Sequence, residues 1–343
     1  MKLEVRTLNK NYQVIFDYNI LDHMNDYYSF NDKKVMIVTD DGVPSFYSEK
    51  IASQINNSFV ITLKQGEQTK SLESYETLCK ILLEKSFSRN DVLIAIGGGV
   101  VGDLCGFVSS TFKRGIKFIN IPTTSLSQID SSVGGKTAIN FNGIKNCIGS
   151  FYQPELVLID FNTLKTLSSR HLKNGLVEAL KMGLILDKEL YQIFKENKQY
   201  EKIEEVIYRS VKAKVDVVEK DEQESYYRMI LNFGHTLAHS FESIYNLEGI
   251  YHGEAVANGM LYMIDNYELK EEVYKIICNL NIPLIKDYDL DKAFSYLIND
   301  KKAIDKNINI VLVNEEGKGE IVIISLEELK RRIVGEKNEL NNW

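Results

Sequence analysis

The chain has 343 residues, of which 44% are hydrophobic and 26% charged, which excludes a largely disordered protein and leaves room for two domains of ordinary size. Its formal net charge of −7 argues against a general affinity for nucleic acid or anionic membrane, so an anionic substrate has to be bound by a local group of cations. Four widely separated cysteines, a start without an apolar signal core and the lack of an apolar stretch long enough to cross a bilayer predict a cytoplasmic protein with reduced thiols.

Residues 1–160 alternate strand-like and helix-like segments, which predicts an α/β fold with a Rossmann-like parallel sheet and helices on both faces. Leu3–Phe16 has the alternating pattern of a short hairpin, and Ser71–Lys85 carries apolar residues at helical spacing. These segments define a first domain over residues 1–160. The strands expected in its parallel sheet are Lys34–Thr39, Phe59–Leu63, Val92–Ile96, Phe118–Ile121 and Leu156–Ile159.

The central strand, Val92–Ile96, is followed by a turn that contains Gly97, Gly98, Gly99 and Gly102, and then by a helix-like stretch. The glycines fit the pattern G-x-G-x-x-G, which is weak when it stands alone, but here the strand and the helix are both present. Because glycines admit a ligand close to the backbone and a helix N-terminus attracts anions, we interpret the turn as a pyrophosphate site rather than a merely tight connection. No acidic residue lies about twenty positions downstream, where a standard dinucleotide fold binds the ribose, so the nucleotide must be held differently.

Polar residues follow several of the predicted strands. Ligands bind at the carboxyl ends of parallel strands, so these residues are expected along one edge of the sheet. Asp40 is the best available substitute for the missing ribose acid, although an aspartate after a strand is also a common turn or cap residue. The residues expected at this edge, beside the glycine turn, are Asp40, Glu67, Lys70, Thr123 and Thr124.

From residue 161 onward, long helical patterns follow one another and predict a second, mainly α-helical domain over residues 161–343. Near its end, Ile308–Val313 and Glu320–Ile324 alternate like a small hairpin, and a polar helix finishes the chain. The helices expected before this hairpin are Asn174–Leu184, Leu190–Glu196, Ile203–Lys220, Met229–Ile244, Glu254–Tyr267 and Glu271–Leu280.

Three of the five histidines, His235, His239 and His252, fall within eighteen residues. His235 and His239 are four apart and share one face of a helix, although an isolated pair of this kind is more often structural or solvent-exposed than metal-binding. Glu178 is the only acid in the predicted helix Asn174–Leu184, where an unpaired carboxylate is costly. Imidazoles and a carboxylate that leave coordination positions open are typical of catalytic zinc, and Fe(II) accepts the same set, so we predict a metal site.

A set of cations stands in glycine-containing or otherwise distinctive contexts. Lys136 is predicted on a flexible turn after a helix and Lys145-Asn146 on a loop soon after, where both lysines are plausible phosphate donors. Arg228 is seven residues before His235 on the same predicted helix, two turns away and roughly on the same face. A single lysine is more simply a solvated surface residue, but a doubly anionic substrate beside a metal explains the whole set. Its members are Arg114, Lys136, Lys145, Lys181, Lys214, Arg228 and Lys301.

Eight short motifs follow one another along nearly the whole chain: Gly97–Asp103, Ser110–Gly115, Pro122–Thr124, Asp130–Lys136, Glu178–Lys181, Asn232–His239, His252–Glu254 and Asp300–Lys302. In this order they resemble the 3-dehydroquinate synthase family of sugar phosphate cyclases. The resemblance implies an N-terminal nucleotide-binding domain, a C-terminal metal-binding domain and a homodimer. It also implies an NAD- and metal-dependent carbon–oxygen lyase of the shikimate pathway, which converts 3-deoxy-D-arabino-heptulosonate 7-phosphate into 3-dehydroquinate and phosphate and recycles NAD.

The resemblance also assigns cofactor ligands, residue by residue. Zinc or cobalt is bound by Glu178, His235 and His252. The residues that it implies for NAD are Asp40, Glu67, Lys70, Gly98, Gly99, Val100, Asp103, Thr123, Thr124, Lys136, Lys145, Thr163, Leu164, Lys165 and Thr166.

The remaining assignments concern the substrate. Arg114 is implied to reach the substrate phosphate in the partner subunit's site. The residues implied for catalysis are Asp130, Lys136, Lys145, Lys181, Asn232 and His239, and those implied for further substrate contacts are Asn146, Lys214, Arg228 and Lys301.

This sequence departs from the family pattern at two places. Ile144 stands where a glycine is expected before Lys145, and Glu222–Tyr227 replaces a more glycine-rich approach to Arg228, which affects loop geometry more than chemistry. Two alternatives stay open within enzymes, another sugar phosphate cyclase and a metal-dependent polyol dehydrogenase that releases NADH. A third, from a different class, is an NAD-binding regulatory or scaffold protein, which an intact set of metal ligands and cations argues against.

Overall fold

The computed structural model describes residues 1–8, 10–245, 249–286, 288–300 and 307–340. They form two compact units: unit 1 contains Met1–Leu172 and Lys214–Gln223, and unit 2 contains Lys173–Ala213 and Glu224–Trp343. Each unit is therefore made from two stretches of the chain, and the predicted domain boundary between residues 160 and 161 stays a prediction. Within the described residues, no helix is both long and apolar enough to cross a membrane.

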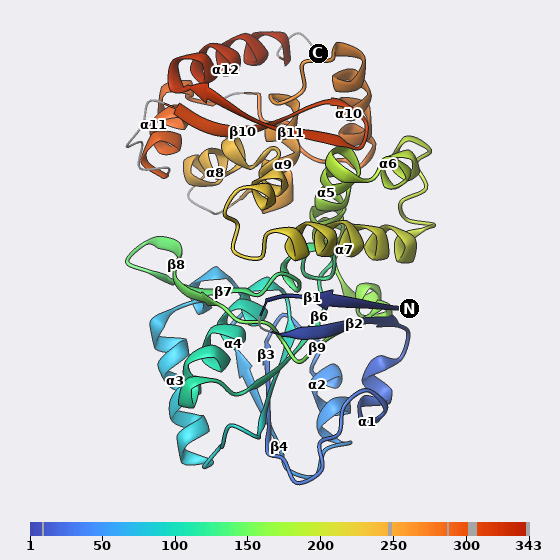
Figure 1. Ribbon diagram of the computed structural model, residues 1–343, viewed down its shortest axis with the longest axis vertical. Helices are drawn as coiled ribbons and strands as arrows, with labels where there is room; N and C mark the ends of the chain where they lie inside the picture. Colours follow the sequence, from blue (N-terminus) through green and yellow to red (C-terminus); the bar gives the residue numbers. More distant parts are fainter. Residues whose placement is uncertain (9, 246–248, 287, 301–306, 341–343) are drawn as a thin grey trace. The chain divides into compact units, whose positions relative to one another are not determined.

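Unit 1 is built on a seven-stranded sheet with the strand order β1-β2-β9-β6-β5-β3-β4 (Figure 1). The first two strands form the predicted antiparallel hairpin, and all other pairs are parallel. This confirms the five predicted parallel strands and the Rossmann-like fold class. The strands are β1 Lys2–Arg6, β2 Asn11–Asp17, β3 Val35–Asp40, β4 Ser58–Leu63, β5 Val92–Gly97, β6 Lys117–Pro122 and β9 Leu156–Asp160.

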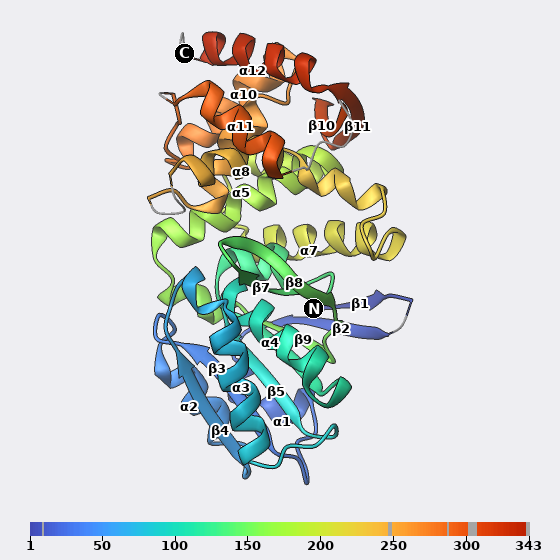
Figure 2. The same cartoon turned by 90° about the vertical axis from the view of Figure 1, so that its left-hand side faces the viewer.

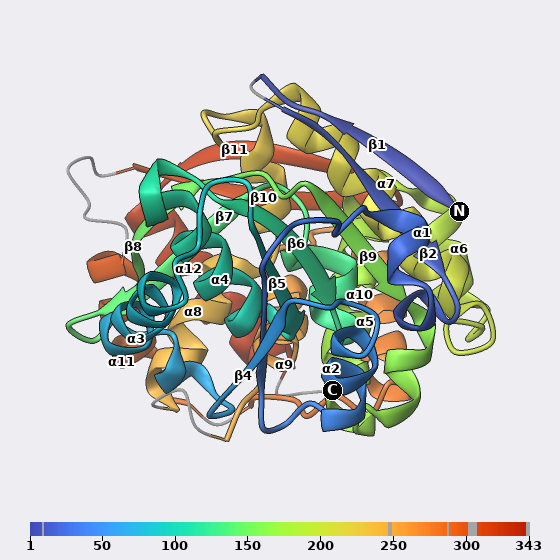
Figure 3. The ribbon, with the colours of Figure 1, turned by 90° about the horizontal axis from the view of Figure 1, so that it is seen from below.

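Helices cover both faces of this sheet, which explains why the central strands are apolar throughout (Figure 3). Along β5, Ile94 and Ile96 pack into one core cluster together with Ile51 of α2, whereas Leu93 and Ala95 pack into the other. The second cluster contains residues of α3 and α4. The helices are α1 Met24–Tyr27, α2 Ser45–Ala52, α3 Leu72–Glu84 and α4 Gly99–Thr111, with short helical turns Ile20–Asp22, Glu67–Thr69, Phe112–Arg114, Ser127–Ser131 and Phe161–Thr166.

The strand order changes direction between β3 and β5. After β3, the next strand, β4, lies on one side of it. After β5, the next strands, β6 and β9, lie on the opposite side, so the connections that leave β3 and β5 run in opposite directions. This point of divergence is where open α/β sheets bind their ligands. Asp40 ends β3 and Gly97 ends β5, so the fold brings the predicted ribose acid and the predicted pyrophosphate turn to the two sides of it.

A second hairpin, β7 (Lys136–Phe141) and β8 (Ile144–Phe151), was not predicted. Lys136 begins β7 and Lys145-Asn146 belong to β8, so the prediction of a flexible turn and a loop at these positions was wrong. The two strands are joined by Asn142-Gly143, whose φ angles of 53° and 79° are both positive, and Phe141 pairs with Ile144 across them. A two-residue Asn-Gly connection with this geometry favours a tight hairpin, so the sequence carried a signal for it.

Unit 2 is mainly helical, with one small antiparallel hairpin followed by the predicted final helix (Figure 2). The predicted hairpin and helices are confirmed, with one exception and several shifted ends. The first residues of α5 and the last residues of α7 belong to unit 1. The elements are α5 Ser169–Leu186, α6 Lys188–Lys195, α7 Ile203–Lys220, a short turn Tyr227–Asn232, α8 His235–Ile244, α9 His252–Leu261, α10 Tyr267–Asn279, α11 Leu290–Asp300, β10 Asn307–Glu315, β11 Lys318–Ser325 and α12 Leu326–Leu340.

The exception is the predicted helix Met229–Ile244, which is broken at Gly234. Gly234 has φ 78°, and α8 begins only at the next residue, His235. Arg228 lies in the separate short turn before the break, so the prediction that Arg228 and His235 share a helix and a face was wrong. A β-carbon on Gly234 would lie 2.8 Å from the Val256 carbonyl oxygen of α9, so tertiary contact requires a glycine here and overrides the helical pattern.

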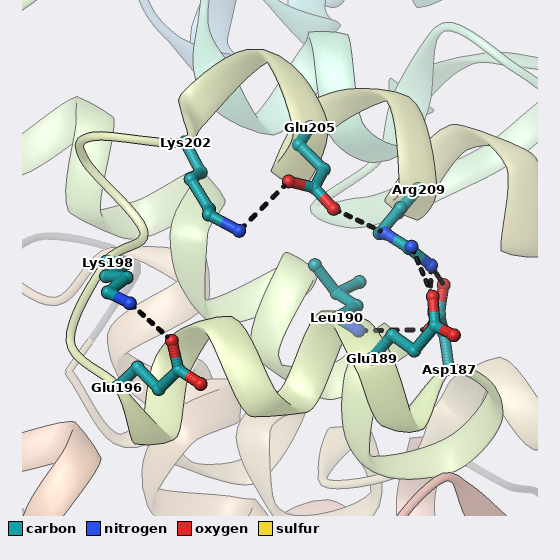
Figure 4. Close-up of polar contacts among 8 residues, drawn as sticks. All are labelled: Asp187, Glu189, Leu190, Glu196, Lys198, Lys202, Glu205 and Arg209. Carbon is teal, nitrogen blue, oxygen red and sulfur yellow. Dashed lines mark hydrogen bonds and ion pairs between the residues drawn. The ribbon is translucent and has the colours of Figure 1, made fainter.

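Arg209 of α7 joins the start of α6 to α7 (Figure 4). Its guanidinium donates to Glu205 at 3.1 Å, to Asp187 at 3.1 Å and to Glu189. Asp187 also caps α6, because its carboxylate accepts the Leu190 N–H at 3.0 Å. These groups are partly exposed, so each ion pair contributes roughly 0–1 kcal/mol, and the cluster fixes geometry more than it adds stability.

Gly183 and Gly335 allow a matched test of helix packing in unit 2. A β-carbon on Gly183 of α5 would lie 2.8 Å from the Tyr191 backbone nitrogen of α6, whereas one on Gly335 of α12 meets nothing within 4 Å. Alanine has a better helix propensity by about 1 kcal/mol, but overpacking against backbone costs about 1–3 kcal/mol. We therefore expect Gly183→Ala to lower the midpoint of thermal unfolding and Gly335→Ala to raise it slightly. Equal midpoints for the two variants would contradict this packing.

Candidate metal centre and nucleotide-binding site

Three helices of unit 2 bring Glu178, His235 and His252 together. Glu178 lies within α5, while His235 and His252 are the first residues of α8 and α9. One ligand atom from each lies within 4.8 Å of the others, and the Nε2 atoms of His252 and His235 are 3.3 and 3.7 Å from Oε1 of Glu178. Donor atoms that share a metal at about 2.0–2.2 Å lie at comparable separations, so this geometry fits a metal site.

Close backbone contacts at glycines fix the two histidines. A β-carbon on Gly259 of α9 would lie 2.1 Å from the Gly234 carbonyl oxygen, so α8 begins directly against α9. At the start of α9, the Gly253 N–H donates to the Asn174 side chain of α5, and a β-carbon on Gly253 would lie 2.2 Å from the Asn174 carbonyl oxygen. His235 and His252 are thus held by main-chain contacts between the three helices, which gives the ligand positions little freedom.

The Glu178 carboxylate is fully buried, and its polar contacts are with Lys181, His235 and His252. Its nearest charge is Lys181, whose Nζ lies 2.5 Å from Oε2. Burial alone would raise the pKa of Glu178, but Lys181, His235 and His252 hold it well below its ordinary value. A fully buried carboxylate is costly unless positive charge lies beside it, and Lys181 pairs with one oxygen while the two histidine Nε2 atoms face the other.

The two imidazoles offer their Nε2 atoms to the same point. Nδ1 of His235 lies 3.1 Å from the Phe233 carbonyl oxygen and donates to it when protonated, which leaves Nε2 as the free lone pair. Burial and the charge of Lys181 lower the pKa of His235 to about 3. The His252 side chain is 30% exposed, so the cluster is open on one side, as a catalytic metal requires.

Glu242 of α8 was missed by the sequence analysis. Its Oε1 lies 3.5 Å from Nδ1 of His252, on the opposite side of the ring from Glu178. Burial lowers the pKa of His252, but contacts with Glu178 and Glu242 outweigh this and raise it to about 10. A second carboxylate behind a ligating histidine orients the ring and adds negative charge. The signal was its spacing, because Glu242 is seven residues after His235 and therefore two turns along the same helix face.

The other residues predicted near the metal lie in unit 2 as well. Lys181 is buried beside Glu178, and the His239 ring centre is 5.9 Å from that of His235, with an exposed side chain. Arg228 is buried in the short turn before α8, and the exposed Asn232 amide donates to Glu224 at 3.4 Å. Lys301 lies outside the described residues.

In unit 1, the glycine turn leaves the start of α4 uncovered. Gly98 is the residue that caps α4, and it has no side chain to accept the first N–H groups of the helix. A β-carbon on Gly97 would lie 2.7 Å from the Val101 side chain, and one on Gly98 would lie 3.2 Å from Thr124. The Thr123 N–H donates to the Gly97 carbonyl at 2.9 Å and ties β6 to the turn. Bare N–H groups at a helix start form a cradle for a pyrophosphate.

Asp40 ends β3 and is buried. Its Oδ1 accepts the Gly42 N–H at 2.9 Å, so Asp40 does stabilise the turn after β3, as the sequence allowed. Its second carboxylate oxygen can still accept a hydrogen bond from a ribose hydroxyl. Burial raises the pKa of Asp40 despite this hydrogen bond. The ribose role stays a prediction.

A polar network joins residues predicted for NAD with one predicted for the substrate. Lys70 donates to Asp103 of α4 and to the side chain of Asn146 of β8. The Glu67 carboxylate accepts the Asn140 amide at 2.8 Å. Burial raises the pKa of Asp103, and Lys70 opposes this shift. The fold thus brings Glu67, Lys70, Asp103 and Asn146 together, through an asparagine that the sequence analysis did not single out.

Residues of the turn after β9 make contacts within unit 1. The Thr163 hydroxyl donates to the Asp160 carbonyl at 2.8 Å and accepts the Gln128 amide at 2.9 Å. Thr166 and Tyr47 share a hydrogen bond of 3.1 Å between their hydroxyls. Lys165 donates to Asn162 at 2.7 Å, and Leu164 is half-buried. The side chains of the two threonines therefore hold the turn, and contact with a nucleotide would come from the backbone and the surface of the turn.

The cations predicted in unit 1 are dispersed. Lys214 donates to the Asp130 carboxylate at 2.8 Å, so two predicted pocket residues are paired with each other. Lys136 and Lys145 are exposed on the β7–β8 hairpin. Arg114 is exposed just past the carboxyl end of α4. Because α4 has 13 residues, Arg114 lies about 20 Å from the glycine turn at the other end of the helix.

Comparison with known proteins gives a consistent result. The family model described as 3-dehydroquinate synthase N-terminal matches residues 60–174, and that described as 3-dehydroquinate synthase C-terminal matches residues 175–303. A 3-dehydroquinate synthase of Clostridium tetani (strain Massachusetts / E88) is 40% identical over 97% of this chain and 94% of its own length. One of Clostridium perfringens (strain 13 / Type A) is 42% identical over 95% of this chain and 98% of its own.

Two solved structures share the fold over nearly the whole chain. A 2-deoxy-scyllo-inosose synthase complexed with carbaglucose-6-phosphate, NAD+ and Co2+ is 25% identical, with a TM-score of 0.86 over 97% of this chain and 99% of that chain. A 2-epi-5-epi-valiolone synthase from Streptomyces hygroscopicus with NAD+ and Zn2+ bound is 24% identical, with a TM-score of 0.84 over 98% of this chain and 99% of that chain.

Glu242 gives a test of the metal centre that leaves the three ligands in place. Glu242→Gln removes the charge behind His252 but keeps the shape, and we expect it to weaken zinc or cobalt binding by roughly 10- to 100-fold. Competition with a chelating dye measures the dissociation constant. Glu327→Gln, an exposed change on α12, is the control and should leave affinity unchanged. Equal affinities for both variants would show that Glu242 does not support the site.

Proposed function

The chain belongs to the 3-dehydroquinate synthase family, and from this premise we propose how its residues carry out the reaction. It is an NAD- and metal-dependent carbon–oxygen lyase that converts 3-deoxy-D-arabino-heptulosonate 7-phosphate into 3-dehydroquinate and phosphate. This is a step of the shikimate pathway, which leads to chorismate and the aromatic amino acids. The observation that carries this conclusion is the near full-length identity of about 40% to relatives of this activity, together with the cluster of Glu178, His235 and His252.

For the metal, Zn(II) or Co(II), the ligands would be Glu178, His235 and His252. The bound metal supplies a Lewis acid that polarises a substrate hydroxyl. Lys181, buried beside Glu178, would keep a positive charge next to that hydroxyl and favour its deprotonation. His239 has an exposed imidazole one turn from His235 and would take up and return a proton on the substrate side. Asn232 would hold the substrate in place by hydrogen bonds.

For NAD, the bare N–H groups of Gly98, Gly99 and Val100 would bind the pyrophosphate, and Asp40 the ribose. NAD held there would supply reversible hydride transfer, with no net oxidation of the substrate over one catalytic cycle. The residues proposed to complete this site are Glu67, Lys70, Asp103, Thr123, Thr124, Lys136, Lys145 and the Thr163–Thr166 turn. The proposal is supported by the Thr123 N–H, which donates to the Gly97 carbonyl of the turn, and by Lys70, which donates to Asp103 of α4.

For the substrate, we propose that Arg228 and Lys214 bind the carboxylate, and that Lys136, Lys145, Asn146, Asp130 and Lys301 bind hydroxyl and phosphate groups. Arg114 is proposed to serve the partner copy of a homodimer. Its exposure at the far end of α4 from the glycine turn supports this role. A fully active monomer in sedimentation analysis would contradict the homodimer.

A cytoplasmic location is also proposed, because Cys79, Cys105, Cys147 and Cys278 are all unpaired, as thiols are in a reducing compartment. Recovery of the native protein with intramolecular disulfides would contradict it.

We also propose the two predicted domains, with an NAD-binding domain over residues 1–160 and a metal- and substrate-binding domain over residues 161–343.

The activity itself is tested by incubating the protein with the heptulosonate phosphate, zinc and a trace of NAD. We expect phosphate and 3-dehydroquinate in equal amounts over many turnovers, with no growth of NADH absorbance, because the hydride is returned. Chelation should abolish turnover and zinc or cobalt should restore it, whereas His235→Ala should lose both metal and turnover. NADH that grows in step with product would identify an ordinary dehydrogenase, and the lack of both products would overturn the proposed function.

The carboxylate role of Arg228 has a separate test. Arg228→Lys keeps the charge but loses the planar fork that binds a carboxylate through two hydrogen bonds. One charge-assisted hydrogen bond contributes about 1.5–3 kcal/mol, so kcat/KM should fall roughly ten- to a hundredfold while the dissociation constants of NAD and metal stay unchanged. Arg331→Lys, an exposed change on α12, is the control. Unchanged kcat/KM in Arg228→Lys would refute the carboxylate role.

A further inference from the structure

Asn140 lies at an irregular point of the β7–β8 hairpin. The pairing register shifts between Ile139 and Phe141, so Asn140 is not paired with β8 in the regular way. Its backbone N–H instead donates to the Lys70 carbonyl at 2.7 Å. The strand therefore leaves its own hairpin at this residue and bonds to the segment that carries Glu67 and Lys70.

The Asn140 side chain continues this connection in two directions. Its Nδ2 donates to the Glu67 carboxylate at 2.8 Å, and its Oδ1 accepts the Asn146 N–H at 2.9 Å. An amide side chain can donate to a carboxylate through its nitrogen and accept a main-chain N–H through its oxygen at the same time. Asn140 thus contacts one residue assigned to NAD and one assigned to the substrate.

Lys70 closes the ring. Its backbone carbonyl accepts from Asn140, and its buried ammonium donates to the side chain of Asn146 and to Asp103. Asn146 has a φ of 54°, a conformation that few residues except glycine and asparagine adopt readily. Four side chains and one main-chain bond therefore determine where the Asn146 amide lies.

Apolar packing does not fix the conformation of the hairpin tip that carries Asn146. Residues 141–147 are all exposed, so the tip of the hairpin buries little apolar surface that could hold it in one conformation. The position of Asn146 depends instead on its hydrogen bonds to Asn140 and Lys70.

We propose that Asn140 is a positioning residue that holds the substrate residue Asn146 against the nucleotide residues Glu67 and Lys70. The inference rests on the proposed function for the roles of these three residues. Its two arms are separable, because the Oδ1 acceptor serves Asn146 and the Nδ2 donor serves Glu67. Each arm should therefore affect a different ligand.

Two substitutions separate the arms. Asn140→Ala removes both, and we expect the KM for the heptulosonate phosphate and the dissociation constant of NAD to rise roughly three- to tenfold each, as for loss of ordinary hydrogen bonds. Asn140→Asp keeps the acceptor for the Asn146 N–H but replaces the donor with a charge that repels Glu67. It should raise the dissociation constant of NAD, measured by calorimetry, and leave the substrate KM within about twofold of the wild type.

A background variant distinguishes positioning from general support of the fold. Asn146→Gly tolerates the positive φ and removes the amide that is being positioned. In this background, Asn140→Ala should change the substrate KM by less than about twofold, because there is no amide left to misplace. Asn11→Ala, an exposed asparagine on strand β2 of the same unit, is the control and should leave both constants unchanged.

The outcomes decide the proposal. It is overturned if Asn140→Ala leaves both constants unchanged, if Asn140→Asp raises the KM as much as Asn140→Ala, or if Asn140→Ala has its full effect on KM in the Asn146→Gly background. If Asn140→Ala does not fold, the Asn140→Asp comparison decides alone. A wild-type protein that binds NAD but forms no 3-dehydroquinate would contradict the proposed function. That result is distinguishable from failure of the Asn140 proposal.

Discussion

The buried carboxylate of Glu178 is the constraint on which unit 2 depends. A fully buried carboxylate is stable in an apolar helix only when positive charge lies beside it, and Lys181 and His252 supply that charge. Glu178 and Lys181 come from α5, His235 from α8 and His252 from α9, so these helices must meet at one point. Glycines at the crossings allow backbone contact there, and Gly259 is an example because any side chain would collide with α8. The helices of unit 2 therefore pack around the buried carboxylate of Glu178.

Unit 1 differs, because its candidate anion site is formed by the main chain at the start of α4. The glycine turn leaves the start of α4 bare, and the divergence of the strand order between β3 and β5 puts Asp40 on the other side. Beside the turn, the buried ammonium of Lys70 is paired with the Asp103 carboxylate. A chain with a net charge of −7 can offer an anion site in this way, because helix N–H groups attract an anion without an excess of cations.

Local patterns predicted the parallel strands, the glycine turn and the metal cluster, because each depends on residues that are close in sequence or chemically distinctive. Val92–Ile96 is apolar on both faces, and Glu178 is the only acid of its helix. The break at Gly234 could not be predicted in this way, because it is imposed by α9, which follows it in the sequence. Asn140 was missed for the same reason, since its partners lie 6 and 73 residues away. The β7–β8 hairpin was predictable from Asn142-Gly143.

The break at Gly234 also separates the short turn that carries Arg228 from the helix that carries His235. His235 and His252 are fixed by contacts of α8 with α9, whereas Arg228 lies in a short turn before the break. The unusual Glu222–Tyr227 approach to Arg228 therefore enters a segment that is not continuous with α8. Glu222 has partners of its own, because its carboxylate accepts the Leu8 N–H at 2.9 Å and the Gln153 amide at 2.8 Å. The approach to Arg228 is thus anchored at Glu222, whereas contacts among α5, α8 and α9 fix Glu178, His235 and His252.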